Sequence, residues 1–208
     1  MNVVGYLKEI YGSGTPILLK DIRIGRKSKT AIRAELSRAA KKGLICRETD
    51  GVYFFPKENS FFTGILFEDI VKKRYIKGKN VRPEFEDLDI YGYYSGITFL
   101  NRMGLTEQFP MALEITTNCT SSRKREVNIL GQRVILRKGR IEINPQNAKS
   151  LQFLDMFRFL DEWEVKENKD KINRYVRETG IGKDVRKYLP LYGFETIKKI
   201  TEGGIVLS

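Results

Sequence analysis

The segment from Thr15 to Pro56 constrains the fold more than any other part of the chain. It follows an amphipathic stretch, residues 3–10, in which apolar side chains recur at helical spacing up to a glycine-rich break. Pro16 favours an extended backbone, and the apolar residues of Leu18–Ile22 then predict a short helix. Gly25 permits the sharp turn that comes next.

A second helix is predicted immediately after Ser28, a residue that caps helices well by accepting a hydrogen bond from a free backbone amide. Its apolar stripe consists of Ile32, Leu36, Ala39 and Ala40, and Gly43 favours a helix end there. On this interpretation Lys29, Arg33 and Ser37 lie on the face opposite the stripe.

A hairpin is predicted next, because residues 44–47 and 52–55 both alternate and surround Asp50-Gly51, a dipeptide that suits a tight turn. The order of helix, turn, helix and hairpin predicts a winged helix-turn-helix. Its wing tip carries Glu48 and Asp50, whose carboxylates would be repelled by a phosphate backbone, so we expect this tip to stay out of a DNA groove.

Positive charge is concentrated in blocks. The chain has 38 Lys and Arg against 26 Asp and Glu, a net charge of +12. Residues 20–47 hold ten bases against two acids, a local net charge of +8, and residues 121–140 hold seven bases against one acid. The blocks indicate a polyanionic partner.

The second helix supplies the candidate DNA contacts, because the recognition helix of a helix-turn-helix lies in the major groove. Ser28 begins this helix, and Lys29, Thr30 and Arg33 fall in its first turns, where side chains reach base edges. Arg33 is the best candidate for reading guanine, since a guanidinium can donate two parallel hydrogen bonds to it. Phosphate contacts are assigned to Arg26, Lys27, Lys41 and Lys42. The alternative is a basic face that only keeps the protein soluble.

The remainder, residues 58–208, is predicted to be a second domain after a DNA-binding domain of residues 1–57, and the whole chain to be of the α+β class. We expect a mixed α/β domain with a small, mainly antiparallel sheet of three strands. Two of them, Glu126–Leu130 and Arg133–Leu136, flank Gly131-Gln132 at hairpin spacing. The other predicted elements are a docking helix within Phe61–Tyr75, a polar loop 77–84, a helix at Tyr93–Met103, a strand at Met111–Thr117, and helices at Asn147–Leu160, Lys169–Thr179 and Gly193–Thr201.

A candidate second nucleic-acid surface lies on the predicted hairpin. It comprises Arg123, Lys124, Arg125, Arg133 and Arg137. A solvated sheet face that binds nothing explains the same residues equally well.

Catalytic patterns are weak. With no histidine there is no Ser-His or Cys-His pair, and Cys46 and Cys119 lie far apart and suit small buried positions, so we predict no enzyme, no metal site and no cofactor. The alternative is a metal-dependent nuclease of the restriction-enzyme kind built on Glu114. That strand lacks the usual nearby lysine, and further acids would have to come from Glu68, Asp69, Asp87 or Asp89.

Localisation is expected to be cytoplasmic. No apolar run approaches the roughly eighteen residues of a membrane span, and the N-terminus lacks the layout of a signal peptide. We therefore expect no membrane association.

The assembled pattern resembles the AbiEi-type antitoxins of bacterial type IV toxin-antitoxin systems, in particular a winged-helix-containing subgroup. The similar stretches are Ala34–Ile45, Gly51–Pro56, Gly92–Thr106, Gln108–Pro110, Glu114–Asn118 and Arg133–Arg137, within about residues 2–160. Gly92-Tyr-Tyr-Ser-Gly96 followed by Gly104-Leu-Thr106 is the more distinctive part, because sequences of the helix-plus-wing type occur in many regulators.

This resemblance implies an abortive-infection function. The N-terminal domain would repress its own operon by binding operator repeats in double-stranded DNA. The C-terminal domain would neutralise a nucleotidyltransferase-like toxin without forming a stable complex.

Overall fold

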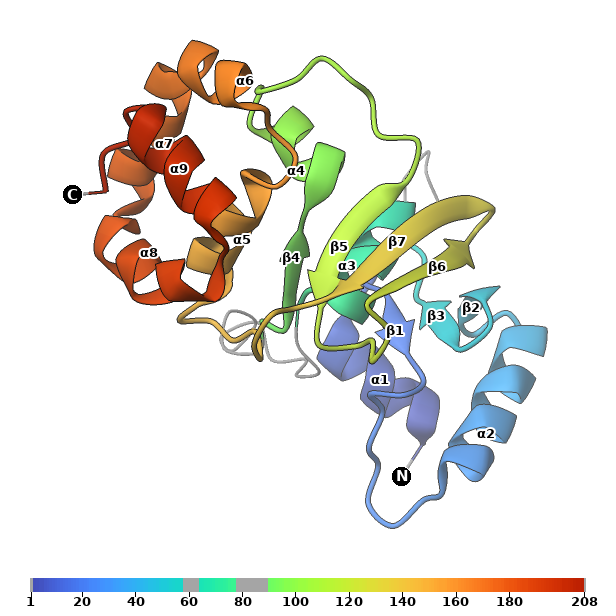
Figure 1. The fold of residues 1–208 in the computed structure, drawn as a ribbon. Coiled ribbons are helices and arrows are strands. Elements are labelled where there is room, and N and C mark those ends of the chain that lie inside the picture. Colours follow the sequence, from blue (N-terminus) through green and yellow to red (C-terminus); the bar gives the residue numbers. More distant parts are fainter. Residues whose placement is uncertain (1, 58–63, 78–89, 208) are drawn as a thin grey trace. The chain divides into compact units, whose positions relative to one another are not determined.

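The computed structural model describes residues 2–57, 64–77 and 90–207, and divides the chain into two compact units, Met1–Asp89 and Ile90–Ser208 (Figure 1). Both units combine helices with a small sheet, so the chain belongs to the mixed α+β class, as predicted. No helix within the described residues is long and apolar enough to cross a membrane.

The first unit contains a three-stranded antiparallel sheet in the order β1-β3-β2. Its elements are α1 (Val3–Tyr11), β1 (Ile17–Leu18), α2 (Lys29–Lys41), β2 (Cys46–Thr49), β3 (Val52–Phe54) and α3 (Phe67–Tyr75). Helix α1 begins where the Asn2 side chain accepts from the amide of Val4, and ends at Gly12, whose φ is 62°. The hydrophobic core of this unit includes Leu7, Ile32, Leu36 and Tyr53.

The helix predicted at Leu18–Ile22 is wrong. Ile17 and Leu18 form β1 and pair with Tyr53 and Val52 of β3. Only a single turn follows, in which the amide of Asp21 donates to the carbonyl of Leu18 at 2.9 Å. Pairing with β3 satisfies backbone groups that a helix of five residues would leave largely free.

The predicted hairpin around Asp50-Gly51 is confirmed. Gly51 has a φ of 70°, which a tight hairpin turn requires and glycine adopts freely. The register shifts between Arg47 and Thr49, so β2 contains an irregularity. Helix α3 lies within the range expected for the docking helix, of which residues 61–63 fall outside the described part.

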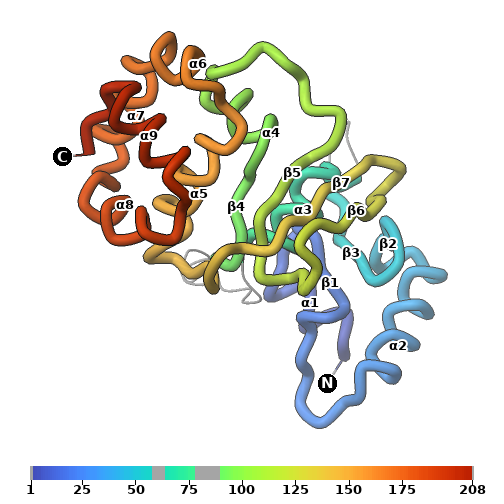
Figure 2. Tube along the Cα trace, in the orientation of Figure 1, coloured from blue at the N-terminus to red at the C-terminus, as the bar shows by residue number. Residues whose placement is uncertain are grey.

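The second unit contains a four-stranded sheet in the order β4-β5-β7-β6 (Figure 2). The strands are β4 (Gly92–Tyr94), β5 (Leu113–Thr117), β6 (Lys124–Ile129) and β7 (Gln132–Lys138). The helices are α4 (Gly96–Arg102), α5 (Ala148–Met156), α6 (Glu162–Glu167), α7 (Lys169–Thr179), α8 (Gly182–Tyr188), the 3-10 helix η2 (Leu189–Leu191) and α9 (Phe194–Glu202).

This sheet has four strands where three were predicted, and one of its strand pairs is parallel. Strand β7 lies between β5 and β6, and it runs parallel to β5, with Ile115 opposite Leu136. The hairpin turn is also displaced by one residue, to Leu130-Gly131, where φ is 51° and 79°. Two successive positive φ values define a type I′ turn, which accepts glycine at its second position.

The helix predicted at Tyr93–Met103 begins later. Tyr93 belongs to β4 and pairs with Thr116, and α4 starts at Gly96. Gly96 has a φ of 58°, and a Cβ there would lie 2.5 Å from the carboxylate carbon of Glu114. Glycine therefore lets the chain turn sharply from strand into helix over the Glu114 side chain.

The helices after the sheet match the sequence more closely. Helix α7 coincides with the predicted Lys169–Thr179, whereas α5 is shorter than the predicted Asn147–Leu160, and α6 and α8 were not predicted. Helix α5 is central to the core of this unit, with Leu151, Phe153, Leu154 and Met156 almost fully buried. The predicted polar loop lies almost wholly outside the described residues.

Candidate nucleic-acid interface

Helix α2 is fixed at both ends by local hydrogen bonds. Ser28 Oγ accepts from the amide of Ala31 at 3.2 Å, as the sequence predicted. At the other end the amide of Gly43, with φ 70°, donates to Ala40, and the amide of Leu44 donates to Ala39, each at 3.0 Å. This Schellman motif satisfies carbonyls that the last turn would otherwise leave free. The result is a rigid helix of 13 residues.

The two sides of α2 differ in chemistry. Ile32, Leu36 and Ala39 are buried. Since each residue advances about 100° around a helix axis, Arg33 lies roughly 90° from the centre of that buried side, and not opposite it as predicted. The side that faces away from the core carries Thr30, Ala34, Ser37, Arg38 and Lys41, which are exposed or half-buried. Most of these side chains are short, so the helix backbone can approach a partner closely.

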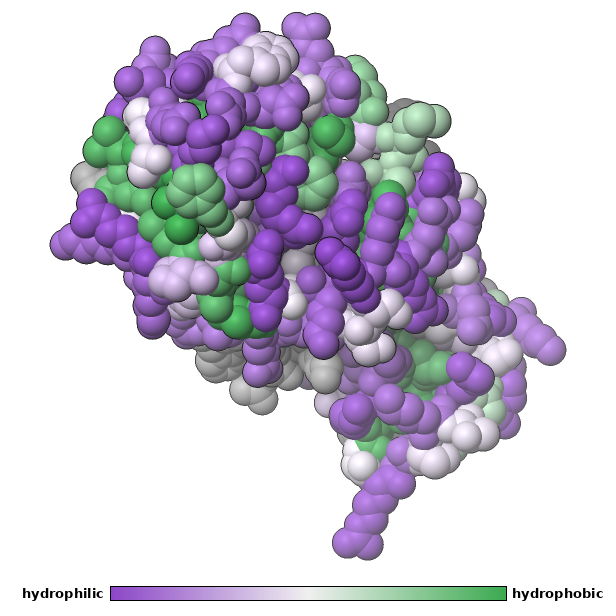
Figure 3. All heavy atoms as spheres, viewed as in Figure 1, coloured by the Kyte–Doolittle hydropathy of each residue, from purple (hydrophilic) through white to green (hydrophobic). Residues whose placement is uncertain are grey.

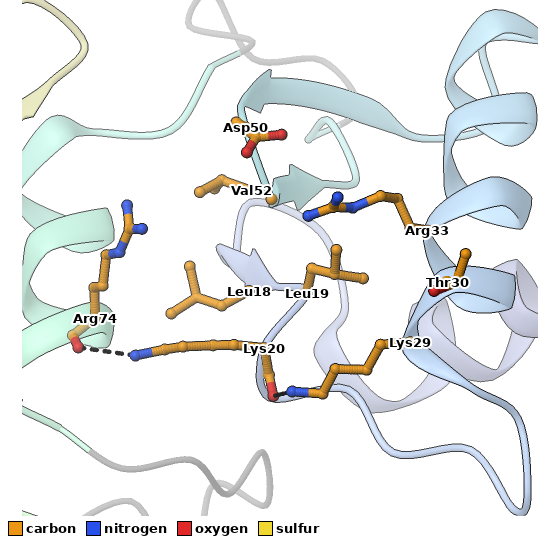
Figure 4. Close-up of a pocket in the computed structure, with 10 residues that line it drawn as sticks. Leu18, Leu19, Lys20, Lys29, Thr30, Arg33, Asp50, Val52 and Arg74 are labelled. Carbon is orange, nitrogen blue, oxygen red and sulfur yellow. Dashed lines mark hydrogen bonds between the residues drawn. The ribbon is translucent and has the colours of Figure 1, made fainter.

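A cavity of about 400 Å³ lies beside the first turns of α2 (Figure 4). Leu18, Leu19 and Val52 provide an apolar part of its wall. The polar part is formed by Lys20, Lys29, Thr30, Arg33, Asp50 and Arg74, which come from the turn after β1, from α2, from the β2–β3 turn and from α3. The single turn that replaces the helix predicted at Leu18–Ile22 thus forms part of this cavity wall.

Four cations converge on this cavity. Lys20 Nζ donates to the carbonyl of Arg74 at 3.1 Å, and Lys29 Nζ donates to the carbonyl of Lys20 at 2.9 Å. An ammonium group has three donors, so both lysines keep donors for a ligand. In Figure 4 the Arg33 side chain extends from α2 toward Leu19 and Val52. Within the described part of the chain, the Arg33 guanidinium makes no hydrogen bond or ion pair.

Two other basic side chains near α2 are already paired with acids. Lys27 forms an ion pair with Glu35 on another side of the helix, and Arg47 pairs with Asp50 at 2.7 Å. The Asp50 carboxylate at the cavity rim is therefore partly neutralised by its own hairpin. Two acids in this region, Asp50 and Glu35, thus do not cancel the cavity cations.

The structure brings together only part of the predicted contact set. Lys29, Thr30 and Arg33 meet at the cavity beside the cap residue Ser28. Arg26 is exposed in the loop before α2. Lys41 and Lys42 lie at the far end of α2, about 18 Å from Lys29 along the axis.

Two cavity cations were missed by the sequence reasoning. Lys20 belongs to the basic block but had no assigned role, and Arg74 lies in the basic last turn of α3. The sequence contains the cluster Lys72-Lys-Arg74, which could have indicated a basic helix end. Nothing in the sequence places that end beside α2.

The candidate second surface is split between the two faces of the sheet. Lys124 lies opposite Arg137 and Asn128 opposite Arg133, whereas Arg125 lies opposite Leu136 and so points to the other face. Arg123 precedes β6. Figure 3 shows hydrophilic side chains over the β6–β7 hairpin on the face viewed.

Two of these arginines are engaged by carboxylates. Arg133 donates from Nε to Glu126 Oε1 at 2.7 Å and from Nη2 to Oε2 at 3.0 Å, and these hydrogen bonds lower the pKa of Glu126. Arg137 donates from Nε and Nη2 to Glu114 Oε2, at 3.0 and 2.8 Å. Lys124 is the remaining member of the predicted set on this face.

Glu114, the centre of the nuclease alternative, is therefore held by an arginine. Asp87 and Asp89 lie outside the described residues, and Glu68 and Asp69 belong to α3 of the first unit. Within the described residues, no three His, Cys, Asp or Glu side chains come together in a way that could hold a metal ion. The two cysteines were expected to be buried, but Cys119 is exposed and Cys46 is half-buried.

No protein-family model matches this chain, and no curated protein matches it.

Proposed function

We propose that this chain is a DNA-binding transcriptional autorepressor and antitoxin of a type IV toxin-antitoxin system, with α2 as its recognition helix. The observation that carries the DNA-binding part is the convergence of Lys20, Lys29, Arg33 and Arg74 beside the capped start of α2. Four cations from three segments, with few acids near them, fit a phosphate backbone.

The proposed fold of the first unit is a winged helix-turn-helix in which the helix before the recognition helix α2 is reduced to the single turn after β1. Two observations support it: β1 pairs with the second strand of the hairpin, and α2 directly precedes that hairpin. The two-residue turn Asp50-Gly51 makes a short wing. Glu48 and Asp50 leave the wing tip acidic even though Arg47 partly neutralises Asp50, and in this proposal the wing stays out of the groove.

In this proposal the side chains on the outward side of α2 contact the bases. Thr30, Ser37 and Arg38 lie there, and small side chains such as Ala34 allow the helix to sit deep in a major groove about 12 Å wide. Arg33 faces the flanking cavity, so in this proposal it binds a phosphate in place of the guanine assigned from sequence. Arg26, Lys41 and Lys42 keep phosphate roles.

The antitoxin part rests on the resemblance of Gly92–Thr106 and the neighbouring stretches to AbiEi-type proteins. In this proposal the second unit counteracts a nucleotidyltransferase-like toxin without a stable complex. The first unit binds operator repeats upstream of its own operon, in the cytoplasm.

The test is a binding measurement with the full chain. A labelled duplex from the protein's own upstream region is titrated in parallel with a shuffled duplex of equal composition, at one fixed salt concentration. The proposal expects a preference of about 10³-fold or more for the upstream duplex. Equal affinity for the two duplexes would exclude sequence-specific repression. Growth of cells that express the neighbouring toxin gene, with and without this chain, tests the antitoxin part separately.

A further inference from the structure

A second cavity, of about 500 Å³, lies within the second unit, among β4, the end of α4, α5 and α7. Its size falls in the range of roughly 300 to 1,000 Å³ that is usual for small-molecule sites. It combines aromatic rings with cations.

The aromatic part is held rigidly. Tyr175 meets Phe99 edge to face with ring centroids 6.2 Å apart, and stacks on the buried Phe153 at 6.1 Å with an interplanar angle of 5°. Across the cavity, the guanidinium of Arg102 lies over the ring of Tyr94, 4.0 Å from its centroid. Gln152 fixes this strand by donating from Nε2 to the carbonyl of Tyr94 at 2.8 Å.

The charged part is mainly positive. Lys171 and Arg174 are three residues apart on α7, so their side chains lie on one face of that helix. Lys171 Nζ donates to the carbonyl of Gly104 at 2.7 Å and keeps two donors. The Arg174 guanidinium engages no partner among the residues that the structure describes. Arg102 is the third cation in the lining, and Glu178 lines the cavity beside these three cations.

We propose that this cavity binds a nucleoside 5′-phosphate, either as a free mononucleotide or as the terminal nucleotide of a strand. The base packs against the rings of Tyr94 and Tyr175, since every base offers a flat face for stacking. The phosphate accepts hydrogen bonds from Lys171 and Arg174, because a guanidinium matches phosphate geometry. The phenol of Tyr175 is neutral at neutral pH and does not repel the anion, and burial raises its pKa further.

This proposal is independent of DNA binding by the first unit, because all the residues that carry it belong to the second unit. The Arg33→Ala variant separates the two: it should leave mononucleotide affinity unchanged. A parallel loss of mononucleotide affinity in that variant would assign nucleotide binding to the first unit and overturn the proposal.

The experiment is calorimetric titration of the full chain with AMP, GMP, CMP and UMP, with the nucleosides and inorganic phosphate as controls. At least one nucleotide should bind saturably, and its nucleoside and phosphate alone should bind at least about tenfold more weakly. Arg174→Ala should reduce affinity at least about tenfold, because it removes the phosphate donors. Arg177 is exposed on the same helix but lies outside the cavity lining, so Arg177→Ala is the matched control and should change nucleotide affinity little.

The source of the nucleotide is distinguished by two short oligonucleotides that differ only in a 5′-phosphate. Tighter binding of the phosphorylated strand than of the mononucleotide would identify a strand end as the ligand, and the reverse order would identify a free nucleotide. Failure of every nucleotide to bind, or equal losses for Arg174→Ala and Arg177→Ala, would overturn the proposal.

Discussion

Replacing Arg33 by alanine tests where the phosphate backbone passes. In the structure, Arg33 faces the cavity with Lys20, Lys29 and Arg74, and lies on the flank of α2 rather than on its outward side. If Arg33 binds a phosphate, its loss should weaken the operator and unrelated DNA by the same factor. If Arg33 reads a base, only the binding free energy for the operator should weaken, by roughly 1 to 3 kcal/mol.

The salt dependence gives this difference a magnitude. The four cavity cations together with Arg26, Lys41 and Lys42 make about seven phosphate contacts, each releasing about 0.9 counterion, which predicts a slope of log affinity against log salt near −6. Raising salt from about 50 to 200 mM then weakens wild-type binding about 6,000-fold, against about 1,800-fold for a variant with one contact fewer. A difference of this size is measurable.

The assay is fluorescence anisotropy on both duplexes at four or more salt concentrations. Arg33→Lys keeps the charge and should keep the slope. Lys27→Ala is the control, because Lys27 is already paired with Glu35 and should change the slope less than Arg33→Ala does. A selective loss of operator binding with an unchanged slope would refute this reasoning and return Arg33 to base reading.

Two further predictions concern the second unit. Gly96→Ala forces a side chain to a φ of 58° and places its Cβ 2.5 Å from the carboxylate carbon of Glu114, which Arg137 holds in place, so the free energy of unfolding measured in urea should fall by about 3 kcal/mol or more. Gly104→Ala, at a φ of 66° with open space around it, should lower the free energy of unfolding by only about 1 to 2 kcal/mol. Equal losses in the two variants would contradict the steric argument. Burial beside the Asp155 carboxylate raises the pKa of both Tyr93 and Tyr192 above the usual value of 10.0. The folded state then holds these protons more tightly than the unfolded state, so stability is unaffected below about pH 10 and falls as pH rises beyond it, and tyrosinate absorbance should appear for these two rings only as the protein unfolds.

Features that depend on neighbouring residues could be predicted from the sequence. The Ser28 cap, the stripe of Ile32 and Leu36 and the end at Gly43 all lie within α2 or next to it. The two hairpins and α7 were found for the same reason. Their signals are turn chemistry and helical spacing, which do not depend on the rest of the chain.

Features that depend on distant residues could not be found in this way. Ile17 and Leu18 form a strand only because Tyr53 and Val52 are available to pair with them. The parallel pairing of β5 with β7 likewise depends on the hairpin folding back so that β7, and not β6, lies beside β5. The cavity beside α2 also depends on distant residues, because Lys20 and Arg74 come near Arg33 only when the chain is folded.

The position of β6 at one end of the sheet order has a consequence for self-association. An outer strand offers unpaired backbone groups to any other strand, including the same strand of a second molecule. Lys124 and Arg125 project from β6 to opposite faces, and both are exposed. A second copy that approached this edge in a parallel, in-register arrangement would bring its own lysine and arginine against them, and the repulsion would oppose that mode of growth of the sheet. Part of the basic hairpin thus disfavours parallel stacking of copies at this edge, whatever else it binds.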